Sequence, residues 1–238
     1  LCAAKRALSE VAGTFSVPFG SPKGTHNGNM PLKRVKRRMV ARNESHNHKK
    51  EEPKMSKAVI FFAQGLEECE ALLCVDILRR AGVEVTIAAV GGERIVTSAR
   101  QVNVVADALA EELDYAQFDA CILPGGIPGV PNLKADATVR QVCTDFAAAG
   151  KKVCAICAAP TALAAFGVLQ GKKATVYPGM DADLTAAGTA YTGLPLTIDG
   201  NIITGEALGA AIPFALAIAR ELAGADAAAR VKKAIVYQ

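Results

Sequence analysis

The sequence predicts a doubly wound α/β domain, in which helices cover both faces of a mostly parallel sheet. Short apolar and β-branched runs alternate with longer amphipathic stretches, as expected for repeated strand–helix–strand units. Hydrophobic residues make up 51% of the 238 and aromatic residues only 5%, so small aliphatic side chains dominate the core. Such side chains suit close packing of helices on a sheet.

The first half of the domain contains three predicted strands and one predicted helix. Residues 58–63 form an apolar run typical of a fully buried strand. Residues 67–81 have the apolar spacing of a helix, and Gly82 provides its C-terminal stop. A second strand is predicted over 83–90 and a short third strand over 102–105.

The second half continues the alternation and ends in a hairpin and a long helix. The hairpin is predicted because Asp199-Gly200 lies between two short apolar runs. The predicted elements are a strand at 118–123, a helix at 136–149, a strand at 153–156, a helix at 160–169, hairpin strands at 196–198 and 202–204, and a helix at 207–223 with a further turn after Gly224.

Three segments that follow predicted strands carry reactive or glycine-rich residues. They are 64–70, 124–126 and 157–160. In doubly wound sheets, ligands bind beyond the carboxyl ends of the strands. We therefore expect a functional site where these three segments meet.

Charge divides the chain near residue 54. Residues 1–54 hold twelve Lys or Arg and four Glu, a net charge of +8, whereas the remaining 184 residues hold fifteen Lys or Arg and nineteen Asp or Glu, a net charge of −4. The first segment is rich in Gly, Ser, Pro and Asn and cannot bury enough apolar surface to offset its ordering entropy. We predict a basic, disordered tail over 1–54, with a short helix near residues 1–11, and a globular domain over 55–238.

Three interpretations of the tail are open. Met55 directly precedes the first strand, which favours a domain that starts there with upstream sequence attached. A transit peptide is the second interpretation, although Glu51 and Glu52 count against it. The third is nuclear localisation or nucleic-acid binding through the basic run 33–38, which no aromatic residue accompanies. Nucleic acid is therefore not an expected partner except through the tail.

Composition also bears on compartment. The longest stretch of small apolar residues, 153–169, is interrupted by Pro160 and is too mixed to span a bilayer, so no membrane association is predicted. The seven cysteines are odd in number and no secretory signal accompanies them. These features favour reduced thiols in the cytoplasm.

Cys157 is the strongest candidate for a reactive residue. A buried strand ends and a helix begins around it, and the small residues Ala155 and Ala159 lie two positions to either side. This arrangement resembles the Gly-x-Ser-x-Gly nucleophile elbow, in which small neighbours permit a tight strand-to-helix turn. The N-terminus of the following helix favours a thiolate at Cys157.

Alternative interpretations of the same cysteine remain. Cys157 could be a buried, inert thiol in an alanine-rich strand. Cys154 and Cys157 form a C-x-x-C, but Cys154 falls in mid-strand, which counts against a redox dithiol. A four-cysteine zinc site lacks a second C-x-x-C, so no metal is predicted.

Any acid or base that assists Cys157 has to be something other than histidine. His26, His46 and His48 all lie in the tail. The nearest carboxylates by topology are Glu67, Glu68 and Glu70, which end the first strand and open the first helix. Glu70 is the one that can point inward, and a carboxyl held near a thiolate has its pKa raised.

Five blocks of sequence resemble the ThiJ/PfpI superfamily, most closely its Parkinson-disease-associated (DJ-one) deglycase branch. They are Gly65-Leu66-Glu67-Glu68-Cys69-Glu70, Val75-Asp76-Ile77-Leu78-Arg79-Arg80-Ala81-Gly82, Leu123-Pro124-Gly125-Gly126, Ala155-Ile156-Cys157-Ala158-Ala159-Pro160-Thr161 and Phe214-Ala215-Leu216-Ala217-Ile218.

The resemblance implies a flavodoxin-like fold, a homodimer and no cofactor. It implies an oxidation-prone nucleophile at Cys157 that is hydrogen-bonded to a protonated Glu70. It also implies that the backbone N–H groups of Gly126 and Ala158 form an oxyanion cradle. Arg80 and Arg100 match arginines that the branch places near the dimer interface and the site.

The chain departs from the family pattern at three places. Tyr177 stands where some members carry a histidine, which removes a possible proton shuttle. Residues 207–209 read Ala-Leu-Gly where the family often has Gly-Pro-Gly. Ala158 stands where the protease-like branch has histidine, which counts against peptidase activity.

The run 125–129 lacks the G-x-G-x-x-G spacing, and Pro131 falls where a helix would begin, so no nucleotide site is predicted.

Three hypotheses of function follow. The first is an enzyme that acts on small aldehydes or glycated substrates, as a glutathione-independent glyoxalase or a protein deglycase, with Cys157 as nucleophile and Glu70 as acid and base. The second is a non-catalytic sensor of oxidative stress, or a chaperone, that uses oxidation of Cys157. The third is a binding module in which the thiol is inert.

Overall fold

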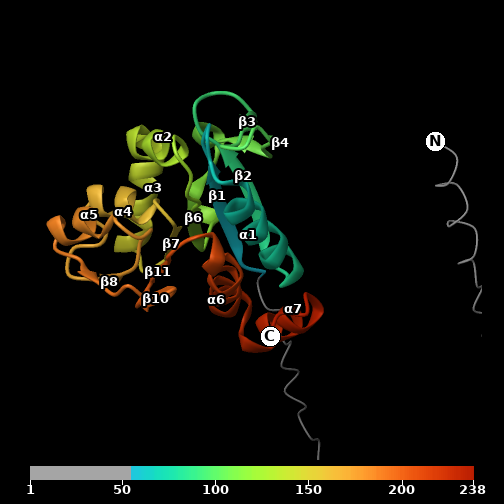
Figure 1. Ribbon diagram of the computed structural model, residues 1–238. Helices are drawn as coiled ribbons and strands as arrows, with labels where there is room; N and C mark the ends of the chain where they lie inside the picture. Colours follow the sequence, from blue (N-terminus) through green and yellow to red (C-terminus); the bar gives the residue numbers. More distant parts are fainter. Residues whose placement is uncertain (1–54) are drawn as a thin grey trace, which may run out of the picture. The chain divides into compact units, whose positions relative to one another are not determined.

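A seven-stranded sheet forms the centre of the computed structural model, which describes residues 55–238 (Figure 1). In order across the sheet the strands are β10 (Leu196–Asp199), β11 (Ile202–Gly205), β7 (Lys152–Ile156), β6 (Ala120–Leu123), β1 (Lys57–Phe62), β2 (Glu84–Ala89) and β5 (Ala108–Leu109). All neighbouring strands are parallel except β10 and β11, which are antiparallel. The predicted tail, 1–54, lies outside the described residues.

The order of the five central strands defines the fold. Taken by their position in the chain, β2, β1, β6, β7 and β11 have the order 2-1-3-4-5 of the flavodoxin-like fold. The connections leave β1 in one direction and β6 in the other, so the switch point lies between these two strands. The predicted doubly wound, flavodoxin-like α/β class is confirmed.

Helices cover both faces of the sheet. Along β1, Val59 and Phe61 point into one core, and Ile60 and Phe62 point into the other. On the first face lie α2 (Gly129–Ala135), α3 (Ala137–Ala148), α4 (Pro160–Ala165) and α5 (Asp181–Ala186); on the second lie α1 (Glu68–Arg80), α6 (Ala211–Ala223) and α7 (Ala225–Ala234). The two cores, one on each face of the sheet, consist mainly of buried aliphatic and phenylalanine side chains, as the composition predicts.

Several short elements lie outside the central sheet. The predicted strand at 102–105 exists as β4 (Asn103–Val105), but it pairs in antiparallel fashion with β3 (Ile95–Thr97) instead of joining the main sheet. The remaining elements are β8 (Lys173–Ala174), β9 (Ala190–Tyr191) and three short 3₁₀ helices, η1 (Ala110–Glu112), η2 (Tyr115–Gln117) and η3 (Leu208–Ala210).

Four sequence-based details are corrected. A helix does follow the glycine-rich run, because Pro131 falls in the first turn of α2, where a missing N–H costs no hydrogen bond. Helix α4 ends at Ala165, four residues early, and Gly167 follows. The helix predicted from 207 begins as η3 and becomes α6 only at Ala211. The predicted hairpin is confirmed, but Asp199 pairs with Ile202, so the turn residues are 200 and 201.

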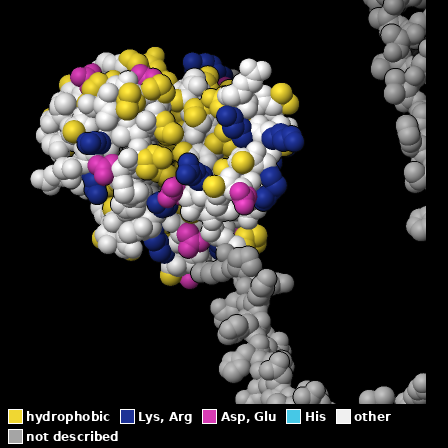
Figure 2. All heavy atoms as spheres, turned by 90° about the horizontal axis from the view of Figure 1, so that it is seen from below, with side chains coloured by type: hydrophobic (Ala, Val, Ile, Leu, Met, Phe, Trp, Pro, Cys, Tyr) yellow, Lys and Arg dark blue, Asp and Glu magenta, His cyan; other side chains and the backbone are white. Residues whose placement is uncertain are grey.

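The surface shows no large region of one charge on the face drawn in Figure 2, where Lys and Arg lie dispersed among Asp and Glu. That face therefore lacks the basic patch typical of nucleic-acid binding.

Among residues 55–238, no helix combines the length and the apolar character needed to cross a bilayer.

Candidate active site

The three segments that the sequence singled out meet at the carboxyl edge of the sheet. They follow β1, β6 and β7, the strands at and beside the switch point. Together with the loops before α5 and α6 they enclose a pocket of about 400 Å³. Its lining comprises Glu67, Glu70, Ala99, Arg100, Gly126, Ile127, Cys157, Ala158, Tyr177, Met180, Ala207, Leu208 and Gly209.

Cys157 occupies a strained turn at the end of β7. Its φ angle of 63° lies in the left-handed region, which non-glycine residues rarely adopt. Hydrogen bonds hold both of its backbone groups: its N–H donates to the carbonyl of Gly205 at 3.0 Å, and its carbonyl accepts from the N–H of Tyr177 at 2.9 Å. The predicted nucleophile elbow is therefore present, and it presents a half-buried thiol to the pocket.

Glu70 lies in the first turn of α1 and points inward, with only 1% of its surface exposed. The N–H of Gly125 donates to its Oε2 at 3.0 Å. Its Oε1 is also buried and has no hydrogen-bond partner that meets ordinary geometry among the described residues. Glu67, the N-cap of α1, accepts the N–H of Glu70 at 2.7 Å and so fixes the start of the helix.

The pKa of Glu70 is raised to about 7. Burial is the main cause, and the negative charge of Glu67 adds to it. Interaction with the Cys157 thiol and the hydrogen bond from Gly125 act in the opposite direction. Near neutral pH the carboxyl can therefore hold or release a proton.

The pKa of the Cys157 thiol is shifted too, and it is raised where the sequence analysis expected it to be lowered. Burial first, and then the charge of Glu70 and the hydrogen bond with it, raise the pKa of Cys157 to about 12. The backbone N–H groups at the start of the helix do favour a thiolate, but burial and the charge of Glu70 outweigh them in this state. The charge of Glu70 acts only while that carboxyl is ionised, so protonation of Glu70 removes this part of the shift.

Two backbone N–H groups donate to the sulfur of Cys157. Hydrogen bonds from Ala158 and Gly126 lower the pKa of Cys157, against the effects above. These are the two donors that the sequence resemblance predicted. They provide fixed positive dipoles where a negative charge on sulfur, or on an oxygen bonded beside it, would develop.

Gly125 is a site residue that the sequence analysis did not single out. A Cβ atom at this position would lie 2.5 Å from the Cβ of Cys157 and 2.6 Å from Oε2 of Glu70. Only glycine therefore lets the thiol and the carboxyl approach each other. The pair of glycines after a buried strand is the signal that could have revealed this role.

The supporting residues predicted from the resemblance separate into two groups. Arg100 and Tyr177 line the pocket. Arg80 does not: it lies in the last turn of α1, at the opposite end of the helix from Glu70, and pairs with Asp76 at 2.7 Å. Within a single chain, Arg80 is therefore not a site residue.

The other described cysteines are unsuited to the chemistry of this pocket. Cys154 is fully buried in β7, which contradicts a redox dithiol open to solvent. Cys74, Cys121 and Cys143 are also fully buried, and Cys69 is exposed on α1. In residues 55–238, no group of three or more His, Cys, Asp or Glu is arranged to hold a metal ion.

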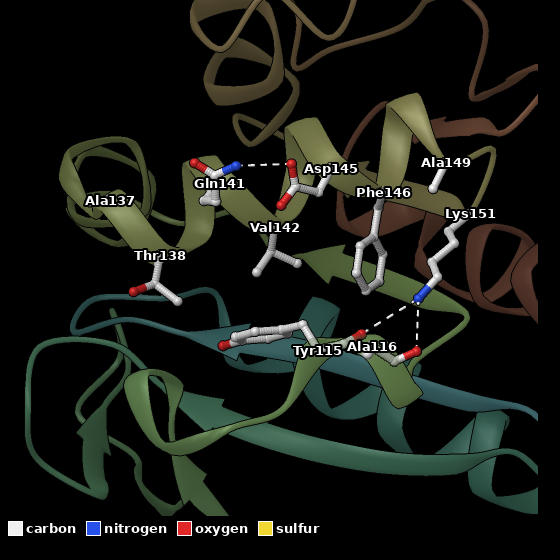
Figure 3. Close-up of a pocket in the computed structure, with 10 residues that line it drawn as sticks. All are labelled: Tyr115, Ala116, Ala137, Thr138, Gln141, Val142, Asp145, Phe146, Ala149 and Lys151. Carbon is white, nitrogen blue, oxygen red and sulfur yellow. Dashed lines mark hydrogen bonds between the residues drawn. The ribbon is translucent and has the colours of Figure 1, made fainter.

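A larger hollow, of about 610 Å³, lies between α3 and η2 (Figure 3). It is near the amino ends of β6 and β7, the opposite edge of the sheet from Cys157. Its polar groups are already engaged: Lys151 Nζ donates to the carbonyl of Ala116 at 3.1 Å, and Gln141 donates to Asp145 at 2.9 Å. It contains no nucleophile with a nearby acid, so we do not assign the functional site to it.

The fold and the site together define a class: flavodoxin-like α/β proteins with a cysteine at a nucleophile elbow and a buried glutamate beside it. Residues 56–221 match the model of the DJ-1/PfpI family, and the chain belongs to that family.

Comparison with individual proteins agrees with this assignment. The chain is 37% identical to the Parkinson disease protein 7 homolog of Danio rerio over 185 residues, which cover 76% of this chain and 97% of that protein. It is 28% identical over 153 residues to a protein of Pyrococcus abyssi named deglycase, covering 64% of this chain and 91% of that one. The crystal structure of Drosophila melanogaster DJ-1beta superposes with a TM-score of 0.75 at 36% identity, covering 77% of this chain and 99% of that one.

Proposed function

We propose that this protein is a cysteine-dependent enzyme that acts on small reactive carbonyls, as a glutathione-independent glyoxalase or a deglycase. The observation that carries the proposal is the juxtaposition of a strained, half-buried Cys157 with a buried Glu70 whose pKa is about 7. The relative named deglycase supports the same class of substrate.

The first step adds the thiol to the aldehyde. Glu70 accepts the thiol proton, the sulfur forms a bond to the aldehyde carbon, and the carbonyl π electrons move to oxygen. The N–H groups of Gly126 and Ala158 stabilise the negative charge that develops, and the proton returns from Glu70 to give a neutral hemithioacetal. A pKa near 7 suits Glu70 to both directions of this transfer.

The second step depends on the substrate. With a 2-oxoaldehyde such as methylglyoxal, Glu70 removes the proton from the hemithioacetal carbon and delivers it to the neighbouring carbon, while the hydroxyl proton passes from the oxygen of the first carbon to the oxygen of the second. The product is a thioester of a 2-hydroxy acid, which water hydrolyses to lactate and the free thiol. With a glycated amine or thiol, the sulfur of Cys157 bonds to the carbinol carbon of the adduct, the bond from that carbon to the amine nitrogen or thiol sulfur breaks, and the thiol proton passes through Glu70 to the leaving group. The resulting Cys157 hemithioacetal then rearranges and is hydrolysed in the same way.

The proposal also concerns the setting in which the enzyme works. Cys157 must remain reduced for this chemistry, so we place the protein in the cytoplasm, and we propose a homodimer by analogy with the family. Sedimentation equilibrium of the purified chain tests the dimer, which would bring a partner's residues toward Arg80.

Turnover of methylglyoxal without added thiol tests the activity. We expect lactate from the wild type, and a loss of roughly a hundredfold or more in kcat with Glu70→Gln and a larger one with Cys157→Ser. Cys69→Ser is the matched control, because Cys69 is an exposed thiol on the same helix as Glu70. Absence of turnover by the wild type, or full activity of Cys157→Ser, would refute the proposal.

A second candidate function rests on the same donors. The N–H groups of Ala158 and Gly126 and a protonated Glu70 could stabilise an oxidised, anionic form of Cys157, as a sensor of oxidative stress or a chaperone requires. Titration with hydrogen peroxide, followed by intact mass and peptide mapping, distinguishes this function. Two oxygens gained selectively at Cys157, without carbonyl turnover, would favour the sensor, whereas an inert thiol would exclude both candidates.

A further inference from the structure

The rim of the Cys157 pocket is unusually apolar for a site that handles small polar aldehydes. Three large hydrophobic side chains on the rim are exposed: Ile127 by 58%, Tyr177 by 47% and Leu208 by 45%. Single exposed hydrophobic residues are normal on a protein surface, but three converging around one opening form a binding wall. Arg100 is also exposed on this rim, whereas the carboxyl of Glu70 lies buried at the inner end of the pocket.

The backbone holds this wall in place. Ile127 follows Gly126, whose missing Cβ leaves room for backbone atoms of Leu66 and Glu67 at only 2.3–2.5 Å from the Cβ position. The loop is therefore packed directly on the segment after β1. The N–H of Tyr177 is bonded to the carbonyl of Cys157 itself, so the backbone of Tyr177 keeps a fixed relation to the nucleophile. The backbone from which each of the two side chains extends is therefore held at the opening.

The apolar surface also extends beyond the first pocket. A second hollow of about 500 Å³ shares Ile127, Ala158 and Met180 with it and continues over Val130 and Pro131. Lys134, Thr161 and Asp183 also line this second hollow, so its apolar part is the part next to Ile127. A three-carbon aldehyde would occupy only the inner end of this space. A bulky substituent on the aldehyde would instead displace water from Ile127, Tyr177 and Leu208.

We propose that the preferred substrates are 2-oxoaldehydes that carry a bulky apolar group, with Ile127, Tyr177 and Leu208 as the residues that determine this specificity. The inference rests on the proposed function and narrows its substrate class. In this chain Tyr177 acts as an apolar wall through its ring. Its hydroxyl takes no part in the preference.

The specificity test compares kcat/KM of the full chain for 4-methyl-2-oxopentanal, methylglyoxal and 4,5-dioxopentanoate, a 2-oxoaldehyde that carries a carboxylate. We expect the branched substrate to be favoured over methylglyoxal by about tenfold or more. Tyr177→Ser and Ile127→Ser should each lower this ratio by about tenfold, while Tyr177→Phe preserves it. The controls Tyr237→Ser and Ile198→Ser alter exposed residues outside the pocket and should change the ratio less than twofold.

A ratio near one in the wild type, with methylglyoxal still turned over, would overturn the inference and leave the proposed function intact. A preference for 4,5-dioxopentanoate, whose carboxylate Arg100 on the same rim would bind, would also overturn it. Because the ratio is taken within each variant, a general loss of folding or of thiol reactivity does not alter it.

If no substrate is converted, a measurement that needs no turnover tests whether the rim of the pocket binds apolar groups. The rate of alkylation of Cys157 by iodoacetamide is followed by intact mass in the presence of 4-methyl-2-pentanone or acetone. We expect the branched ketone to protect Cys157 at concentrations about tenfold lower than acetone, and the difference to disappear in Tyr177→Ser. Equal protection by the two ketones would refute the apolar wall.

Discussion

The two edges of the central sheet differ in backbone strain and in the pairing of buried polar groups, and the volumes of their hollows do not reflect this difference. At the amino edge, the hollow between α3 and η2 is the larger, about 610 Å³ against about 400 Å³ at the carboxyl edge. In it, Gln141 is paired with Asp145, and Tyr115 and Lys151 donate to backbone carbonyls. At the carboxyl edge, Cys157 adopts a left-handed conformation, and the buried Oε1 of Glu70 has no hydrogen-bond partner among residues 55–238.

The comparison teaches that unfavourable features mark the site better than volume does. A strained φ angle and a buried ionisable group each destabilise the fold and persist only where surrounding contacts enforce them. Here Gly205, Tyr177 and Gly125 supply those contacts. Among the described residues that line the hollow between α3 and η2, no non-glycine residue is left-handed and no buried polar side-chain atom lacks a partner, so these residues should tolerate change. Four predictions test this contrast.

The largest effect is expected at Gly125. Gly125→Ala introduces a Cβ at 2.5 Å from the Cβ of Cys157, which pushes thiol and carboxyl apart. We expect carbonyl turnover to fall by at least about a hundredfold, and the free energy of unfolding in urea to fall by about 1–3 kcal/mol. Gly209→Ala is the control on the same pocket, because no atom lies within 4 Å of its Cβ position. Equal losses in the two variants would break the contrast.

The next effect is a pH-dependent gain in stability from Glu70→Gln. The unfolded carboxyl ionises near 4.5, whereas in the fold the pKa is about 7. Below pH 4.5 both states are protonated and Glu70 costs nothing, but as the pH rises to 7 the folded state loses stability relative to the unfolded one. Above pH 7 the cost is constant, about 3 kcal/mol.

Urea unfolding of both forms from pH 4.5 to pH 8 measures this cost. Glutamine cannot ionise but still accepts the hydrogen bond from Gly125, so the advantage of Glu70→Gln over the wild type should grow across this range and then level off. Glu93→Gln, at an exposed glutamate, should give a difference that does not change with pH. A pH-independent advantage at Glu70 would show that burial does not strain this carboxyl.

A smaller effect is expected from the backbone of the elbow itself. Cys157→Gly should be more stable than Cys157→Ala by about 0.5–1 kcal/mol, since glycine adopts a φ of 63° without strain. At Cys154, three residues earlier in a regular strand, the order should reverse, and glycine should be the less stable by a similar amount. Thermal unfolding of the four variants measures both differences. The same order of stability at both positions would show that the left-handed φ angle of Cys157 does not strain the backbone.

The smallest effect is expected at the amino edge. Gln141→Ala in the larger hollow removes an exposed hydrogen bond to Asp145. We expect the free energy of unfolding to change by less than about 0.5 kcal/mol and turnover by less than about twofold. A loss of turnover comparable to that of Gly125→Ala would mean that the larger hollow also serves the reaction.

Much of this molecule is legible from its sequence because its main signals are local. The buried strands and the helix stops are set by runs of apolar residues and by single glycines, so six of the seven strands of the central sheet follow from pattern. The two-residue edge strand β5 was not predicted. The β3–β4 hairpin was only half predicted, because Ile95–Thr97 has three residues and its pairing depends on a partner eight residues away. Periodicity is also silent on α2, where Pro131 suggests a break unless the start of the helix is known.

The site was predictable in its members more than in its energetics. Cys157 and Glu70 follow from strand ends and helix phase, and Arg100 and Tyr177 from the resemblance. Arg80 was carried over with them, although the single chain leaves it at the far end of α1. The raised pKa of Cys157 could not be read from the sequence, because it depends on the burial that results when distant segments close over the thiol.

The hydrogen bonds on either side of Cys157 have a consequence for the making of the protein. Its N–H is held by Gly205 and its carbonyl by Tyr177, both of which are synthesised after it. A nascent chain that ends before residue 205 therefore contains the cysteine but not the geometry that presents it. The position of the thiol beside Glu70 and the backbone donors is therefore established only when β11 has joined the sheet beside β7.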